Sequence, residues 1–250
     1  MASIELLLQY ECLSVIAVAA MFGLICGSFV TALSYRLPRG KDFVIGRSRC
    51  PSCSTYLSPR DLIPVLSWVI SMGRCRHCKM AVSARYPVIE LLCGALFVVV
   101  VVFQMPFELD RIILLWVLTV LLLALSVIDF EFRHFQNGLV LVLYGMAGVL
   151  AWLDQRSIIP ILIAVAAVFS IGLCLRVLGQ FLEKKPGLAW GDIKLGMALA
   201  IPIPMAQLLT FLIVFGFITL VLTIWVGLGK GKRHFPLGLA LCAGAFAALL

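Results

Sequence analysis

The sequence predicts an all-α integral membrane protein with about eight transmembrane helices and one long loop between the first two. Three observations favour this fold class. The mean hydropathy of the 250 residues is +1.12, and only 13% of the residues are charged. The apolar runs are too long and too numerous to fold inward around a single core. Lys and Arg also concentrate on alternate connections between these runs, as they do in multi-pass proteins.

The apolar runs break at proline, glycine and charged residues, and the breaks define eight predicted spans. The sixth and eighth are short for a helix that crosses a bilayer, which needs about 20 residues. No Lys or Arg precedes the first run, whereas Glu5 and Glu11 do, so we expect a retained span and not a signal peptide. The predicted spans are residues 12–35, 87–104, 111–128, 138–153, 158–178, 192–202, 206–228 and 236–250.

The basic residues predict the orientation of the chain. Ten of the 20 Lys and Arg lie between the first two spans, and all others except Arg111 and Arg156 fall on the same face when the connections alternate. Basic loops are retained in the cytoplasm, so the long loop is predicted to be cytosolic and the N-terminus to be outside. The net charge of +8 then reflects the orientation of the chain in the membrane, and anionic lipid headgroups are the expected partners of the basic residues. The charge gives no indication of nucleic-acid binding.

The long loop contains two CxxC pairs, 21 residues apart, in the stretch CPSCSTYLSPRDLIPVLSWVISMGRCRHC. Two such pairs offer four thiolates for one tetrahedral shell, which is typical of structural zinc. Two disulfides or a redox pair are the alternative, and the reducing cytosol favours zinc. His77 could replace one ligand but is expected to face solvent. The predicted ligands are Cys50, Cys53, Cys75 and Cys78.

These features divide the chain into three predicted regions. Residues 1–36 form the first transmembrane helix, residues 37–86 form the cytosolic tetracysteine loop, and residues 87–250 form a transmembrane core of about seven helices. A closed shell of four thiolates leaves no position for a water molecule on the metal. We therefore expect the zinc ion to hold the loop folded and not to catalyse a reaction.

Three acidic residues lie near predicted membrane boundaries, where an ionisable group is costly unless it is paired or hydrated. Asp129 ends the third span in LSVIDFEFRHFQN, and Asp192 opens the sixth in GLAWGDIKLGMALA. Asp192 could be only a helix N-cap, and Asp129 only a polar group at the surface. Glu90, in YPVIELLCGALF, is expected to reach the interface or to pair with a basic loop residue.

The alternating topology puts Asp129 and Asp192 on the same, cytoplasmic side of the membrane. If they converge, the two carboxylates can share one proton, so that one activates water while the other protonates a leaving amine. This is the chemistry of aspartyl peptidases. The helix dipoles favour Asp192 as the base and Asp129 as the acid, and Gly191 is predicted to leave room for the backbone of a substrate.

Together these segments resemble the type IV prepilin peptidase family of membrane aspartyl peptidases. The resemblance covers nearly the whole chain, with CGSFVTALSYRLPRG, the CxxC loop with DLIPVLSW, RYPVIELLCGALF, the Asp129 segment and WGDIKLGMALA in the family's order. The family's two catalytic aspartates fall on Asp129 and Asp192. Thr31, Gln136 and Ala189 stand where the family usually has Asn, Pro and Gly, and HFPLG replaces Pro-Phe-Gly-Pro; we expect these changes to affect substrate preference more than the reaction.

The resemblance implies an endopeptidase that removes the basic leader from type IV prepilins or type II secretion pseudopilins at the cytoplasmic face of the bacterial inner membrane. Many members also methylate the new N-terminus with S-adenosylmethionine, and the intact cysteine loop extends that expectation to this chain. No glycine-rich loop indicates where the donor would bind. Two other functions compete: a polytopic transporter, which usually carries internal repeats that this sequence lacks, and a zinc-loop membrane scaffold.

Overall fold

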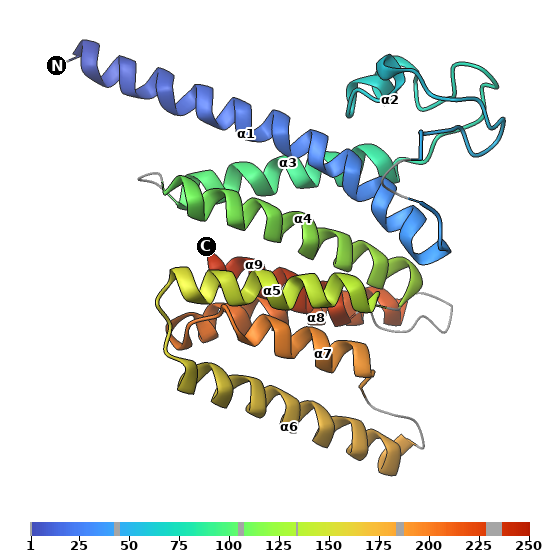
Figure 1. Cartoon of the computed structure of the whole chain (residues 1–250). Coiled ribbons are helices and arrows are strands. Elements are labelled where there is room, and N and C mark those ends of the chain that lie inside the picture. The colour runs from blue at the N-terminus through green and yellow to red at the C-terminus, as the bar shows by residue number, and fades with distance from the viewer. Residues whose placement is uncertain (1, 43–45, 105–107, 134, 184–187, 229–236) are drawn as a thin grey trace. The chain divides into compact units, whose positions relative to one another are not determined.

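The computed structural model of the chain contains a helix at each of the eight predicted spans (Figure 1). It describes residues 2–42, 46–104, 108–133, 135–183, 188–228 and 237–250. Within these ranges there are no strands, and a short helix that the sequence did not predict, α2 (Leu66–Ile70), lies in the long loop. The other helices are α1 (Ala2–Arg36), α3 (Arg85–Phe103), α4 (Leu109–Phe132), α5 (Asn137–Leu153), α6 (Ile158–Glu183), α7 (Trp190–Ala200), α8 (Leu208–Leu228) and α9 (Leu237–Leu249).

The prediction of an all-α membrane protein is confirmed, because five segments in the described residues are long and apolar enough to cross a membrane. Helices α5 and α9 are apolar but shorter. Helix α7 has 11 residues and is therefore about 16 Å long, roughly half the thickness of the hydrocarbon core. Eight full crossings thus remain a prediction. Five of the basic residues behind the predicted orientation, Lys184, Lys185, Lys230, Lys232 and Arg233, lie outside the described residues.

The chain divides into two compact units, Met1–Val120 and Leu121–Leu250, and α4 contributes to both. In the N-terminal unit, glycines let α1 pack closely against α3. A Cβ atom at Gly23 would lie 2.8 Å from Gly94 Cα, and one at Gly27 would lie 2.7 Å from Glu90 Cα. Small residues of this kind allow helix backbones to approach each other in membranes, so these glycines serve helix packing.

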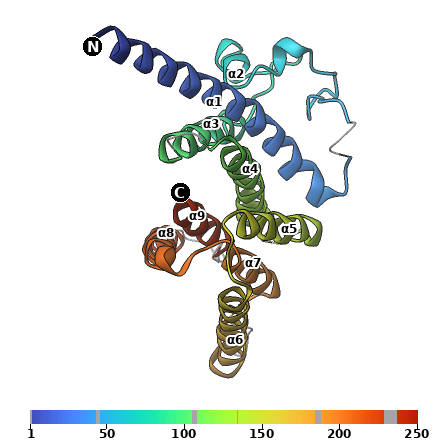
Figure 2. The ribbon, with the colours of Figure 1, turned by 60° about the vertical axis from the view of Figure 1, so that its left-hand side comes forward.

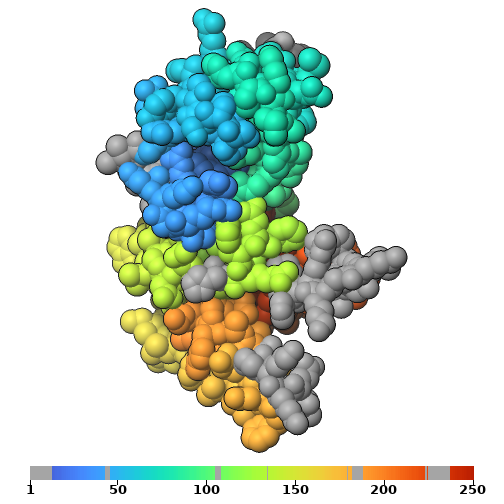
Figure 3. All heavy atoms as spheres, turned by 90° about the vertical axis from the view of Figure 1, so that its right-hand side faces the viewer, coloured from blue at the N-terminus to red at the C-terminus, as the bar shows by residue number. Residues whose placement is uncertain are grey.

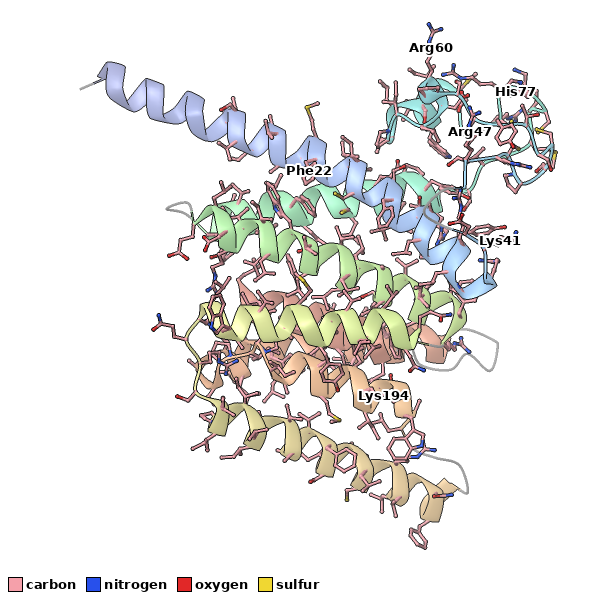
Figure 4. All side chains as sticks on the ribbon, viewed as in Figure 1. Phe22, Lys41, Arg47, Arg60, His77 and Lys194 are labelled. Carbon is pink, nitrogen blue, oxygen red and sulfur yellow. The ribbon has the colours of Figure 1, made fainter. Side chains whose placement is uncertain are left out.

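An aromatic cluster joins α1, α3 and the first half of α4 in the N-terminal unit. The rings of Phe97 and Trp116 stack with their centroids 5.0 Å apart, and Phe22 meets both rings at 5.7–5.9 Å. The indole N–H of Trp116 also donates to the carbonyl of Phe97 at 3.2 Å. Phe22, which Figure 4 labels on α1, thus fixes the packing of these three helices around one apolar contact.

In the C-terminal unit, the short helix α7 packs against α5, α6 and α9, and α8 packs against α9. Figure 2 shows α7 among these three neighbours. A Cβ atom at Gly172 of α6 would lie 2.9 Å from Ile193 of α7, and Ile193 and Leu195 are almost completely buried. Contacts with these neighbours therefore hold α7 in place, although the helix has only 11 residues.

Candidate active site and metal centre

Asp129 lies one turn before the end of α4, and its side chain is 5% exposed. Its Oδ2 atom accepts a hydrogen bond of 2.9 Å from the backbone N–H of Gly238, the second residue of α9. The free N–H groups at a helix N-terminus stabilise a negative charge. The carboxylate therefore faces the positive end of α9 as well as the negative end of its own helix.

Asp192 is the third residue of α7. The N-cap position belongs to Ala189, and the backbone N–H of Ala189 donates to the Asp192 carboxylate. The interpretation of Asp192 as the N-cap itself is thus wrong by three residues. The Asp129 carboxylate lies at the N-terminus of α9, and Asp192 lies in the first turn of α7. A positive helix end therefore acts on each carboxylate. The helix dipoles thus do not distinguish a base from an acid, contrary to what the sequence suggested.

The ring of Phe135 links the neighbourhoods of the two aspartates. A Cβ atom at Gly191, next to Asp192, would lie 2.6 Å from Phe135 Cδ2. One at Gly238 would meet Phe135 Cζ as well as Asp129 Oδ2, the latter at 2.9 Å. The two carboxylates are also close enough to interact electrostatically. The structure thus gathers the end of α4 and the starts of α7 and α9 around one ring, at the end of the C-terminal unit that Figure 3 views.

This packing corrects one expectation from the sequence. Gly191 was predicted to leave room for a substrate backbone, but the Phe135 ring fills the space next to it. Glycine is needed at this position because any side chain would collide with that ring.

Two polar contacts fix the start of α7, where Asp192 lies. Arg176 of α6 donates to the carbonyl of Leu188 at 2.6 Å, and its guanidinium lies 4.8 Å from the ring centroid of Trp190. The backbone carbonyl of Lys194 accepts from the Tyr144 hydroxyl at 3.0 Å, which ties α7 to α5. Lys194 is labelled in Figure 4. These contacts hold the Asp192 backbone from two sides.

No sequence pattern pointed to Phe135, and only a weak one pointed to Gly238. Gly238 ends the stretch HFPLG, which we noted only as a departure from the family's pattern. Its hydrogen bond joins residues 109 positions apart in the chain, and no spacing rule predicts such a contact.

We predict that Gly238→Ala slows the reaction of this site about 10²-fold, the effect of misplacing a reacting group by about 1 Å. The new methyl group would collide with Phe135 and displace Asp129 Oδ2. The measurement is the rate of substrate turnover at equal amounts of membrane-inserted protein. Gly145→Ala is the matched control, because nothing lies within 4 Å of a Cβ atom there. Equal rates for both variants would contradict the assigned geometry.

In the long loop, the two CxxC pairs fold into two matching turns, which we call knuckle 1 (Arg49–Tyr56) and knuckle 2 (Arg74–Ala81). An isolated β-bridge closes each knuckle. In both, the N–H of the first cysteine donates to a carbonyl five residues later at 2.9 Å. The residue after the second cysteine has positive φ, 58° at Ser54 and 61° at Lys79. Each knuckle thus presents its two sulfur atoms from one tight turn.

The four cysteines that the sequence identified form one cluster. Their Sγ atoms all lie within 4.8 Å of one another, and those of Cys50 and Cys78 are 3.9 Å apart. A zinc ion with Zn–S bonds of about 2.3 Å needs sulfur atoms about 3.8 Å apart. His77 is exposed and outside the cluster. The arrangement is therefore compatible with a tetrahedral zinc site that His77 does not join.

Hydrogen bonds favour the thiolate form at two of these cysteines. Contacts with Thr55 lower the pKa of Cys53 to about 6. The backbone N–H groups of Cys78 and His77 lower the pKa of Cys75. Against a lowering contact with the Met80 backbone, desolvation and the other three cysteines raise the pKa of Cys78 to about 11. The thiolate is the form that binds metals, so only Cys53 and Cys75 are favoured in that form before a cation binds.

Glu90 connects the loop to α3. The carboxylate is 6% exposed, and Oε2 accepts the backbone N–H of Val65 at 2.7 Å. Its partner is thus a backbone amide and not the basic side chain that the sequence suggested. Val65 has φ 59° and ψ −53°, inside a γ-turn closed by a hydrogen bond from Leu66 N–H to Pro64 O. A β-branched residue rarely adopts this conformation, and the Glu90 contact helps to hold it.

The N-terminal unit also contains a cavity of about 690 Å³ between the loop, the end of α1 and the start of α3. Its volume lies within the range of sites for small molecules, about 300–1,000 Å³. Basic and aromatic side chains and the Glu90 carboxylate contribute to its lining. Examples are Arg36, Arg49, Arg74, Tyr35, Trp68 and Tyr86.

Comparisons with known proteins identify the family of the chain. The family described as Bacterial Peptidase A24 N-terminal domain matches residues 21–104, and the Type IV leader peptidase family matches residues 116–224. A prepilin leader peptidase/N-methyltransferase of Neisseria gonorrhoeae is 30% identical over 90% of this chain and 87% of that protein. Proteins of the same name from Burkholderia pseudomallei and Bacillus subtilis are 28% and 29% identical, each over 94% of this chain, and over 84% and 94% of their own lengths.

No solved structure matches the chain. The two family matches nevertheless cover most of the chain, and the matched ranges contain its four loop cysteines and its two aspartates. The chain belongs to the type IV leader peptidase family.

Proposed function

We propose that this protein is a membrane aspartyl endopeptidase that removes the basic leader of type IV prepilins or type II secretion pseudopilins. Asp129 and Asp192 are the proposed catalytic residues. The observation that carries the proposal is the packing of Gly191 and Gly238 against Phe135, because it brings the helix ends that hold the two aspartates together. The printed names of the relatives support the substrate class. Family membership gives no support to the transporter or scaffold alternatives.

In the proposed reaction, the two carboxylates share one proton. The ionised member removes a proton from water as the water oxygen attacks the scissile carbonyl, and the protonated member donates its proton to the leaving amine. The Gly238 N–H holds Asp129 Oδ2, and Arg176 holds the start of α7. These contacts fix the carboxylates before the substrate binds, which lowers the cost of reaching the transition state.

We propose that the reaction occurs at the cytoplasmic face of the bacterial inner membrane, with the N-terminus outside. The distribution of Lys and Arg supports this orientation, because basic loops are retained in the cytoplasm. The three regions proposed from the sequence then become a first transmembrane helix (1–36), a cytosolic loop (37–86) and a transmembrane peptidase core (87–250).

We also propose that the tetracysteine cluster binds one structural zinc ion. Cys50, Cys53, Cys75 and Cys78 would be its ligands, and the spacing of their sulfur atoms supports this assignment. The ion would supply the cross-link between the two knuckles. The four cysteines complete the coordination shell, so the metal has no role in the peptide cleavage.

A second activity, methylation of the new N-terminus, is proposed from the names of the relatives and from the cavity of the N-terminal unit. S-adenosylmethionine would supply the methyl group. Its carboxylate matches the basic lining, and its adenine can stack on an aromatic side chain such as Trp68 or Tyr86. The chain's own residues would bind and orient the donor.

The test is the intact mass of a prepilin co-expressed with the wild-type chain or with Asp192→Asn. We expect the mature mass, with one added methyl group, only with the wild type. Cleavage without the methyl mass would refute the second activity alone. If no prepilin or pseudopilin lost its leader, the proposed peptidase function would be wrong.

A further inference from the structure

The cytosolic loop exposes several large apolar side chains between residues 62 and 72. Met72 is 84% exposed, Ile70 61% and Val69 56%. Water-soluble domains rarely expose contiguous apolar surface of this kind without a binding function. We call this set the apolar loop patch; it consists of Leu62, Ile63, Leu66, Val69, Ile70 and Met72.

The loop's own core does not use this patch. Helix α2 turns Trp68 inward, where the indole N–H donates to the carbonyl of Val82 at 3.0 Å. A Cβ atom at Gly73 would lie 2.8 Å from the same indole ring. On the inner side of α2, Trp68 packs in the loop. The residues Leu66, Val69 and Ile70 therefore form the opposite, exposed side of the helix.

A hydrogen bond ties the patch to a helix that is long and apolar enough to cross the membrane. Val65, in the middle of the patch, donates to the buried carboxylate of Glu90 at 2.7 Å. Glu90 lies in the second turn of α3, which is long and apolar enough to span the membrane. Figures 1 and 2 show α2 beside the first turns of α3, whereas Figure 4 shows His77 at the far end of the loop.

The charges around the patch suit an anionic membrane surface. Arg60 precedes the patch and Arg74 follows it, and both are exposed. A surface with apolar side chains on one side and Arg at its edges binds at the boundary between lipid headgroups and acyl chains. Both ends of the loop continue into helices that are long and apolar enough to cross the membrane, so the loop is tethered near the lipid surface.

We infer that the apolar loop patch inserts into the interfacial layer of the lipid bilayer and anchors the tetracysteine loop to the membrane surface. This membrane contact is independent of the proposed peptidase reaction. The patch enters the acyl boundary, Arg60 contacts headgroups, and the bond between Val65 and Glu90 sets the depth.

Photo-crosslinking in liposomes of phosphatidylethanolamine and phosphatidylglycerol tests this inference. Ile70, Met72 or His77 is replaced by p-benzoylphenylalanine in the full chain, and intact mass spectrometry detects an added phospholipid. We expect lipid adducts at Ile70 or Met72 and none at His77, which is the control within the same loop. The inference is overturned by adducts of equal yield at all three positions, by crosslinks from the patch to a second copy of the chain, or by no lipid adduct at either patch position. These outcomes do not depend on whether the protein cleaves a prepilin.

Discussion

Asp129→Asn and Asp192→Asn are each expected to slow leader cleavage by at least about 10³-fold, equivalent to roughly 4 kcal/mol of barrier. Asparagine has nearly the shape of aspartate, but it cannot exchange the proton that the proposed reaction needs. Its side-chain oxygen can still accept the N–H of Gly238 that now bonds Asp129, so the fold should survive. The measurement is the cleavage rate of a purified prepilin by each variant in proteoliposomes.

The two aspartates should also act as one unit. Because neither carboxylate completes the reaction alone, the double variant should be no slower than the slower single variant. Asp110→Asn is the matched control, since Asp110 lies in the first turn at the opposite end of α4 from Asp129, and it should leave the rate unchanged. A single variant that cleaves at the wild-type rate, or single effects that multiply in the double variant, would contradict the shared-proton mechanism.

The positions of the long helices could be predicted because a membrane imposes long apolar runs with charged ends. Polar residues beyond the membrane can continue a helix, so α1 begins at Ala2 and not at residue 12, and α6 continues to Glu183. Helix α2 was not predicted because its five residues are too few to show a periodic pattern of apolar residues. Its fold depends on Trp68 packing and on the bond from Val65 to Glu90.

The candidate site residues were predictable where they form a local sequence motif or where their side chains are energetically costly in an apolar segment. Asp129 and Asp192 were identified because carboxylates are rare in apolar segments, and the cysteine ligands because each CxxC lies within one turn. Phe135 and Gly238 could not be identified in this way. Their role comes from contacts between segments that are distant in the sequence. Because the Gly238 contact puts Asp129 at the positive end of α9, the helix dipoles no longer assign separate acid and base roles to the two aspartates.

The other large effect is expected at the tetracysteine cluster, where Cys50→Ser should release about one zinc ion per chain and unfold the knuckles. In small zinc domains the metal supplies about 10–16 kcal/mol of folding free energy, and in this loop the β-bridges and a few hydrogen bonds are weak substitutes. The measurements are zinc content by mass spectrometry and trypsin cleavage within residues 37–86, which should become at least about tenfold faster. Cys174→Ser is the control, because Cys174 is exposed on α6 and outside the cluster. If Cys50→Ser kept its zinc, or if the wild-type chain held none, the cluster would not be a structural zinc site, and the loop would have to depend on its contacts through Trp68 and Glu90.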